Sequence, residues 1–171
     1  MNPATALKAS PKRAIFEDDH EDYRESFRSF LAAEVAPNFK EWDASGVVDR
    51  ELFKKAAGHG FMGMAIPEEY GGPGADDWRF NVVLTEEAVC SGVGAAFGGP
   101  MLTTDIVLPY ILTSGTEEQK ERWLPGVASG DTVLAIAMTE PGTGSDLAAV
   151  QTTAIRDGDE YVVNGSKTFI T

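Results

Sequence analysis

The sequence has one cysteine, two histidines and comparatively few basic residues. Because Cys90 has no partner cysteine, neither an intrachain disulfide nor a cysteine-based zinc cluster can form. His20 lies among carboxylates on an expected helix surface and His59 lies between two glycines, and neither has a partner at metal-ligand spacing. We therefore predict no metal site and no catalytic histidine. A reducing compartment fits this cysteine usage, so the expected location is cytoplasmic.

Basic residues number 14 against 27 acidic residues, which gives a formal net charge of −13. A field of this sign repels nucleic acid and anionic lipid, so neither is an expected partner. The candidate apolar runs are Phe61–Ile66 and Val133–Met138. Both are far shorter than the roughly 18 residues that span a bilayer, so no integral membrane protein is expected.

The first fifteen residues contain no apolar core of the signal-peptide kind. A disordered arm over residues 1–15 is the favoured interpretation. A mitochondrial presequence is the alternative, which the scarcity of arginine disfavours.

Residues 16–130 have helical periodicity and predict an all-helical domain. The first expected helix has the apolar stripe Tyr23, Phe27, Phe30 and Leu31 and is closed by Pro37, and the second covers Arg50–Ala57 with Asp49 as its cap. A third runs from Asp76 or Asp77 to Cys90 and buries Phe80, Val83, Leu84 and Ala88, after which Gly92, Gly94, Gly98 and Gly99 break the chain before a fourth helix over Met101–Leu112. A capping box at Thr116 starts the fifth, which frays near Pro125 and stops by Gly130. The acidic run Glu17–Glu25 is interpreted as a solvated face, and Phe61–Gly74 as a packed loop. The adjacent carboxylates Glu86 and Glu87 are expected to project in different directions.

After Asp131 the apolar period changes from about 3.6 to 2, which indicates strands. The expected strands are Val133–Met138, Val150–Arg156, Tyr161–Val163 and Lys167–Thr171, with a turn at Asp157-Gly158-Asp159 and a hairpin signal at Asn164-Gly165. The fold class is therefore α+β: an N-terminal helical domain over 16–130, then the first strands of a β-domain over 131–171. Because the strand pattern continues to Thr171, we expect this chain to be the front part of a longer protein.

The segment Met138–Asp146 leaves a predicted buried strand and contains two glycines, a proline and three hydroxyl side chains. Glycines let backbone approach a ligand, and free N–H groups and hydroxyls can hold a phosphate or the edge of a heterocycle. On these grounds alone, a ligand-binding loop and an ordinary turn remain equally open.

The stretch Ala137–Asp146, AMTEPGTGSD, resembles a signature of the flavin-dependent acyl-CoA dehydrogenases, and Asn164–Thr171, NGSKTFIT, resembles a second segment of that family. The resemblance runs from about Phe16 to the end of the chain and is strongest to the long-chain branch. It implies a helical domain, a middle β-domain that resembles a barrel, and a C-terminal helical bundle that lies outside this chain.

The resemblance also implies an FAD site and an acyl-CoA site. The implied FAD-binding residues are Ile136, Ala137, Met138, Thr139, Gly144, Ser145, Phe169, Ile170 and Thr171, and the implied substrate-binding residues are Ser145, Gly99 and Leu102. Phe169 takes the place of an aromatic residue, often Trp, that packs on the flavin ring. The family's catalytic glutamate comes from the C-terminal bundle, so no residue of this chain is assigned a catalytic role.

The implied activity is α,β-desaturation of a fatty acyl-CoA thioester, with hydride transfer to flavin N5. A carboxylate removes the α-proton, while the protein orients and desolvates the reacting groups. Electrons would pass to an electron-transfer flavoprotein, and the full-length protein would be a homotetramer. The alternatives are an acyl-CoA oxidase or flavin oxygenase of the same fold, and a non-catalytic helical interaction module.

Overall fold

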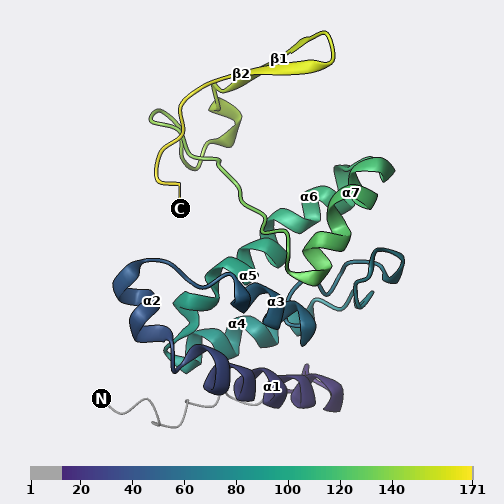
Figure 1. Cartoon of the computed structure of the whole chain (residues 1–171), viewed down its shortest axis with the longest axis vertical. Helices are drawn as coiled ribbons and strands as arrows, with labels where there is room; N and C mark the ends of the chain where they lie inside the picture. The colour runs from purple at the N-terminus through teal and green to yellow at the C-terminus, as the bar shows by residue number, and fades with distance from the viewer. Residues whose placement is uncertain (1–12, 171) are drawn as a thin grey trace. The chain divides into compact units, whose positions relative to one another are not determined.

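A computed structural model describes residues 13–170, which divide into two compact units between Leu134 and Ala135 (Figure 1). The first unit is helical, and the second contains a β-hairpin between loops. The order of helices followed by strands confirms the predicted α+β class. The predicted boundary near residue 131 lies a few residues before this division and stays a prediction. Residues 1–12 of the predicted arm lie outside the described residues.

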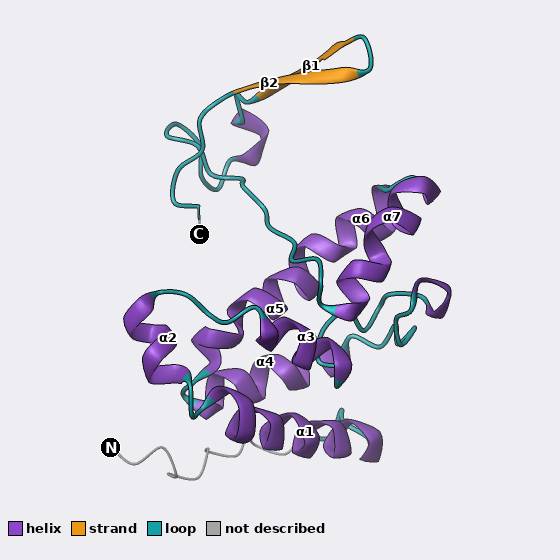
Figure 2. Ribbon diagram, in the orientation of Figure 1, coloured by secondary structure: helices purple, strands orange, loops and turns teal. Residues whose placement is uncertain are grey.

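Most of the first unit is helical, as Figure 2 shows. Its α-helices are α1 (Asp18–Phe30), α2 (Phe39–Ser45), α3 (Glu51–Gly58), α4 (Arg79–Ser91), α5 (Gly98–Leu102), α6 (Leu108–Ser114) and α7 (Glu117–Ser129). Two π-helical turns, η1 (Leu31–Val35) and η4 (Thr103–Val107), continue α1 and join α5 to α6. Two short 3₁₀ helices are η2 (Glu68–Tyr70) and η3 (Gly94–Phe97).

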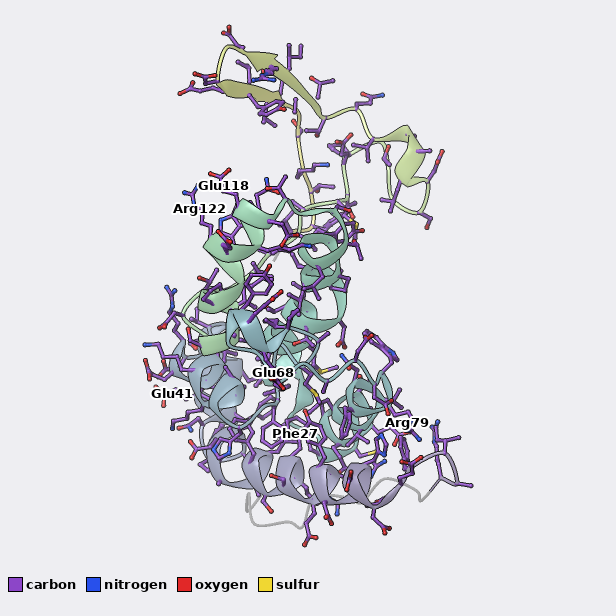
Figure 3. All side chains as sticks on the ribbon, turned by 90° about the vertical axis from the view of Figure 1, so that its right-hand side faces the viewer. Phe27, Glu41, Glu68, Arg79, Glu118 and Arg122 are labelled. Atoms are coloured by element: carbon purple, nitrogen blue, oxygen red, sulfur yellow. The ribbon has the colours of Figure 1, made fainter. Side chains whose placement is uncertain are left out.

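Helix α1 supplies one wall of the main apolar core. Phe27, Phe30 and Leu31 of the predicted stripe are buried, and Figure 3 shows Phe27 pointing into the helical unit. Phe27 packs against Phe61 and Phe97, with ring centroids 4.9 Å apart in both pairs. The helix begins after Glu17, whose N–H donates to His20 Nδ1, and its η1 extension ends at Val35, before Pro37. The predicted helix and its termination are therefore confirmed.

The buried face of α1 also carries charge, which its apolar pattern did not predict. Arg24 is 4% exposed and donates from Nη1 to Glu86 Oε2 at 3.1 Å and to Glu87 Oε1 at 3.0 Å. Arg28 Nε donates to Glu87 Oε2 at 3.0 Å. The expectation that Glu86 and Glu87 project in different directions is wrong, since both carboxylates reach one guanidinium. These ion pairs join α1 to α4.

His20 is only 2% exposed, so its expected place on the helix surface is wrong. Its ring stacks on Phe80, with centroids 4.5 Å apart, and its Nε2 lies 3.3 Å from Asp77 Oδ2. His20, Arg24 and Phe27 follow helical spacing, so all three belong to the inward face of α1. His20 and Arg24 contact Asp77 and Glu87, which are more than fifty residues away in sequence. The acidic residues next to His20 in the sequence do not indicate these contacts.

Helix α4 and the helical stretch 94–114 form an antiparallel pair joined by a short turn. Val83, Leu84 and Ala88 of α4 are buried as predicted. The second helix, expected over Met101–Leu112, begins earlier, and Gly98 and Gly99 lie within it instead of breaking it. At Gly99 a Cβ atom would come 2.6 Å from Phe53 Cζ, so close packing accounts for this glycine.

By length and composition, the stretch Gly94–Ser114 could cross a membrane. Core helices of soluble proteins pass the same test. The expectation that no segment is long enough to span a bilayer is therefore wrong. Asp105 is the single charged residue of Gly94–Ser114, and the remaining residues of this stretch are uncharged.

Helix α7 begins with the predicted capping box: Gln119 N–H donates to the Thr116 hydroxyl, and the Gln119 side chain accepts from Thr116 N–H. The expected fraying at Pro125 is wrong, because the helix continues to Ser129 and ends at Gly130, which has φ +78°. Pro125 is exposed, so water can bind the carbonyl that its missing N–H leaves free.

The second unit contains η5 (Leu147–Ala149), β1 (Thr153–Asp157) and β2 (Glu160–Asn164). The strands pair antiparallel from Thr153↔Asn164 to Asp157↔Glu160, around the predicted turn, where Gly158 has φ +63°. The hairpin signal at Asn164-Gly165 is wrong, since Asn164 is the last residue of β2 and Gly165 follows the strand. The expected strands over Val133–Met138 and Lys167–Ile170 are not formed among the described residues. A strand requires a neighbouring ladder of backbone hydrogen bonds. Among the described residues, one backbone–backbone hydrogen bond, from Thr168 N–H to Thr139 O, forms where these two segments meet.

The buried ion pairs predict a large loss of stability for Glu87→Gln. Removing one charge leaves Arg24 and Arg28 without a full counter-charge, so the free energy of unfolding should fall by about 3 kcal/mol or more. Urea denaturation measures this change. Glu118→Gln on the exposed face of α7 (Figure 3) is the matched control and should change stability by less than about 0.5 kcal/mol. Equal effects of the two substitutions would contradict the structural role of Glu87.

Candidate functional site

A tight turn closes the glycine- and hydroxyl-rich loop of the second unit. Glu140 N–H donates to Thr143 O at 2.9 Å, and Thr143 N–H donates back to Glu140 O at 3.1 Å. The Thr143 hydroxyl donates to Ala149 O at 3.0 Å, which attaches the turn to η5. Pro141 and Gly142 are the two central residues of this turn, between the hydrogen-bonded Glu140 and Thr143. The loop thus has a defined shape.

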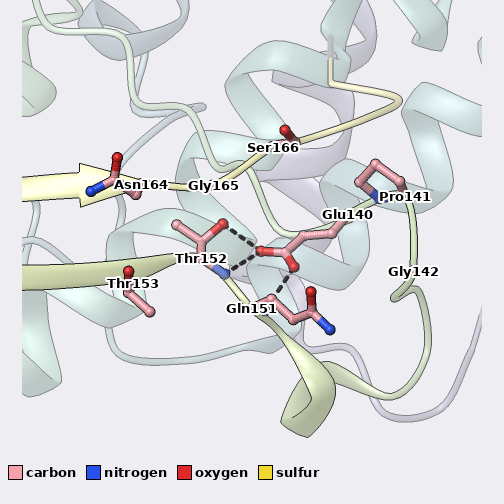
Figure 4. Close-up of a pocket in the computed structure, with 9 residues that line it drawn as sticks. All are labelled: Glu140, Pro141, Gly142, Gln151, Thr152, Thr153, Asn164, Gly165 and Ser166. Carbon is pink, nitrogen blue, oxygen red and sulfur yellow. Dashed lines mark hydrogen bonds between the residues drawn. The ribbon is translucent and has the colours of Figure 1, made fainter.

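Glu140 is the hub of this unit. Glu140 is only 7% exposed. Its carboxylate accepts hydrogen bonds from the Thr152 hydroxyl, from Gln151 N–H at 2.7 Å and from Thr152 N–H at 2.9 Å (Figure 4). Lys167 Nζ donates to Glu140 Oε1 at 3.0 Å. The Thr152 hydroxyl, the Gln151 N–H and the Lys167 ammonium stabilise the charged form and lower the pKa of Glu140 to about 2.

The same contacts place the two sequence motifs side by side. Lys167 Nζ donates to Met138 O at 3.0 Å as well as to Glu140. One residue further on, Thr168 N–H donates to Thr139 O at 3.0 Å. The loop and the terminal stretch, almost thirty residues apart in sequence, therefore form one surface of the second unit.

Several polar groups on this surface have no hydrogen-bond partner among the described residues. Among residues 13–170, the backbone N–H groups of Ile136, Ala137, Met138, Thr139, Gly144 and Ser145 donate no hydrogen bond to the protein. The hydroxyls of Thr139 and Ser145 likewise make no hydrogen bond within that range. Around Gly144, no atom lies within 4 Å of the place where a Cβ would stand. Donors and open space are thus available to a ligand.

Phe169 is 92% exposed and has φ +55°, in the left-handed region that a residue with a Cβ adopts at a cost of about 1 kcal/mol or more. An apolar ring held in water by a strained backbone is a platform for a flat partner. Ile170 follows and is 44% exposed. Thr171 lies outside the described residues, so its predicted role is not placed.

A groove of about 550 Å³ opens beside the hub. It is lined by Glu140, Pro141, Gly142, Gln151, Thr152, Thr153, Asn164, Gly165 and Ser166 (Figure 4). It therefore includes the corner of the turn and the end of β2.

The helical unit has an apolar groove of about 430 Å³. It is lined by Ala88, Val89, Gly92, Gly94, Ala95, Gly98 and Met101. The predicted substrate residues Gly99 and Leu102 follow Gly98 and Met101 in sequence without lining this groove. Gly99 packs on Phe53, and Leu102 is half-buried. Gly99 and Leu102 belong to the helical unit and Ser145 belongs to the second unit, so their joint role in substrate binding stays a prediction.

Residues 17–131 match the family model of the acyl-CoA dehydrogenase N-terminal domain, and residues 135–171 match that of the middle domain. The chain belongs to the acyl-CoA dehydrogenase family. Both predicted motifs lie in the part that matches the middle domain. This confirms the resemblance inferred from sequence.

Two relatives illustrate the extent of the match. The long-chain specific acyl-CoA dehydrogenase, mitochondrial, of Sus scrofa is 45% identical over 159 residues, which are 93% of this chain and 36% of that protein. An acyl-CoA dehydrogenase structure from Geobacillus kaustophilus is 45% identical, has a TM-score of 0.85, and is matched over 93% of this chain and 41% of its own. The chain thus spans little more than a third of the length of these relatives.

A third comparison involves a bound cofactor. A glutaryl-CoA dehydrogenase from Mycobacterium smegmatis, solved in complex with FADH2, is 31% identical with a TM-score of 0.77. The match covers 90% of this chain and 39% of that one.

Glu140, Lys167 and Thr152 organise this site, yet the sequence assigned them no role. Glu140 and Lys167 lie within the quoted motifs, and their pairing depends on the fold of the loop between them. No spacing rule links residues so far apart in sequence. Their role is to shape the surface that carries the predicted FAD-binding residues, which remain predictions.

The low pKa of Glu140 predicts acid sensitivity of this loop. Since the folded-state pKa, about 2, is below the ordinary value of about 4.3, the stabilisation is complete above that ordinary value and is lost as pH falls towards 2. The protection factors of the Gln151 and Thr152 amides, which compare their exchange with the intrinsic exchange rate at the same pH, should fall through this window in the wild type. In Glu140→Gln, exchange should already be fast at neutral pH and lack this extra dependence.

Glu160→Gln is the matched control, because Glu160 is an exposed carboxylate of the same unit. It should retain the wild-type exchange profile at Gln151 and Thr152. An unchanged profile in Glu140→Gln would show that the carboxylate does not hold these amides.

Proposed function

We propose that this chain forms the N-terminal helical domain and the opening part of the middle domain of an FAD-dependent acyl-CoA dehydrogenase. The enzyme would desaturate a fatty acyl-CoA thioester between Cα and Cβ. One observation carries this proposal. The backbone N–H groups of residues 136–139 and 144–145, which donate no hydrogen bond within the described residues, lie on the surface that Glu140 and Lys167 assemble. Family membership supports it.

The available groups suit FAD. N–H groups and the hydroxyl of Thr139 match the acceptors along the pyrimidine edge of a flavin, and Phe169 offers a ring for its flat face. Gly144 and Ser145 would bind the pyrophosphate, and Ser145 also the entering CoA ester. The chain has a net charge of −13, so its overall electrostatic field repels the pyrophosphate. Backbone N–H donors close to the ligand can bind this anion in spite of that field.

Bound FAD would supply the acceptor for the β-hydride. The protein would bind and orient the thioester and exclude water around it. Glu140 is a poor candidate for the base that removes the α-proton, because its carboxylate is buried, fully engaged and of low pKa. We assign the base to no residue of this chain, in keeping with the family resemblance.

We place the acyl chain in the apolar groove of the helical unit, next to Gly99 and Leu102. Its lining by small and apolar side chains suits an aliphatic tail. Electrons would leave through an electron-transfer flavoprotein, and the whole enzyme would be a homo-oligomer located in the cytoplasm. The family resemblance supports the electron-transfer flavoprotein and the homo-oligomer, and the single cysteine suits the cytoplasm.

Spectroscopy of the enzyme that contains this chain tests the proposal. The protein should be yellow, and one equivalent of a saturated acyl-CoA should bleach its flavin absorbance without oxygen. Reoxidation by electron-transfer flavoprotein but not by O₂ would identify a dehydrogenase, and fast reoxidation by O₂ an oxidase. A protein that binds no flavin would contradict the proposal and favour a helical interaction module.

Phe169→Ala should weaken FAD binding about 10-fold, since loss of one aromatic stacking partner costs about 1–3 kcal/mol. Titration of the stripped enzyme with FAD, followed by flavin fluorescence, gives the affinity. Phe169→Trp preserves an aromatic face and should bind FAD about as well as the wild type. Tyr161→Ala removes another exposed aromatic ring of the same unit and is the matched control. Equal affinities for Phe169→Ala and the wild type would remove Phe169 from the cofactor site.

A further inference from the structure

Lys167 brings a positive charge into contact with the backbone of the second unit. Its Nζ donates to Met138 O and to Glu140 Oε1, both at 3.0 Å. The Lys167 side chain is 25% exposed and that of Glu140 is 6% exposed, so solvent screens this ion pair only weakly. Lys167 and Arg156 are the two basic residues after position 134. The ammonium of Lys167 therefore acts at short range on the Met138 carbonyl.

The Met138 carbonyl and the Thr139 N–H belong to one peptide group. Because this group is conjugated, a cation at its oxygen draws electrons from its nitrogen and makes the N–H a stronger donor. The peptide bond is trans, so the N–H points away from the ammonium. Among the described residues, Thr139 N–H donates no hydrogen bond. Lys167 thus strengthens a donor that a ligand can use.

The next peptide group along the chain differs in both respects. Thr139 O accepts from a neutral donor, Thr168 N–H, at 3.0 Å. Glu140 N–H is already donated to Thr143 O at 2.9 Å. Within the described part of this loop, the Met138–Thr139 peptide is therefore the one that combines a cation at its oxygen with an N–H left for a ligand.

We propose that Lys167 is a positioning residue that acts through the Met138–Thr139 peptide and makes the site favour reduced over oxidised FAD. The inference rests on the proposed function, because it requires a flavin at the Thr139 N–H. In the proposed reaction the flavin gains two electrons with the β-hydride, and the α-proton goes to the base. Reduction adds electron density to the pyrimidine ring of a flavin, so a stronger N–H donor at that edge favours the reduced form.

Glu140 moderates this effect of Lys167. Its carboxylate offsets part of the ammonium charge, and hydrogen bonds from Gln151 and Thr152 hold it in place. Removing the cation and removing its counter-charge should therefore shift the relative affinity for the two redox forms in opposite directions. A purely structural role would not produce opposite signs, because a loosened loop weakens the binding of both forms alike.

The test uses the enzyme that contains this chain, stripped of its cofactor. The readout is the dissociation constant for oxidised FAD divided by that for reduced FAD, the latter measured without oxygen. Lys167→Gln keeps a neutral donor for Met138 O and should lower this ratio about 10-fold, because the charge assistance is lost. For a two-electron couple, that change equals about 30 mV in reduction potential. Lys167→Arg keeps the charge and should restore the wild-type ratio.

Arg156→Gln is the matched control, because Arg156 Nε also donates to a backbone carbonyl of this unit, Gly158 O, at 3.0 Å. It should leave the ratio unchanged. Glu140→Gln should raise the ratio, and it tests the proposal without altering Lys167.

An unchanged ratio in Lys167→Gln would overturn the proposal, as would a ratio in Glu140→Gln at or below the wild-type value. A wild-type enzyme that binds neither form of FAD would instead refute the proposed function.

Discussion

The carboxylate of Glu140 holds the second unit together at the place where its chemistry would occur. It accepts hydrogen bonds from Gln151, Thr152 and Lys167, which belong to segments on either side of the hairpin. In the described part of this unit only two strands pair, so a sheet does not fix the loop. A buried carboxylate with several donors supplies that order instead, because leaving any of these groups unpaired would be costly. The positions of Met138 and Thr139 follow from it.

This arrangement explains how an acidic chain could bind an anionic cofactor. Lys167 is engaged with Glu140 and with Met138 O, so it shapes the surface and is not free to form an ion pair with a phosphate. The donors left to a ligand are backbone N–H groups and hydroxyls, which are directional and carry no net charge. The helical unit has, by itself, an apolar groove. One unit thus suits the polar part of an acyl-CoA and its cofactor, and the other suits the aliphatic part.

Local signals in the sequence predicted local structure well. The apolar stripe of α1 and the capping box at Thr116 act within a few residues, and both were predicted correctly. The short helix α2 was missed, since it has seven residues and buries none of them. The buried pairing of Arg24 with Glu87 could not be predicted, because it joins helices more than sixty residues apart. The strand prediction failed at Val133–Met138 for a similar reason: a short apolar run shows that a segment can be a buried strand, not that it has a strand to pair with. The proximity of Thr139 to Thr168 followed from the family resemblance alone.

Hydrogen–deuterium exchange on the FAD-stripped and FAD-loaded enzyme that contains this chain tests the central claim most directly. The account predicts that FAD slows exchange at the amides of 136–139 and 144–145, and leaves the β1–β2 turn at Gly158 unchanged. If those loop amides exchanged equally with and without FAD, the surface assembled by Glu140 would not be the flavin site.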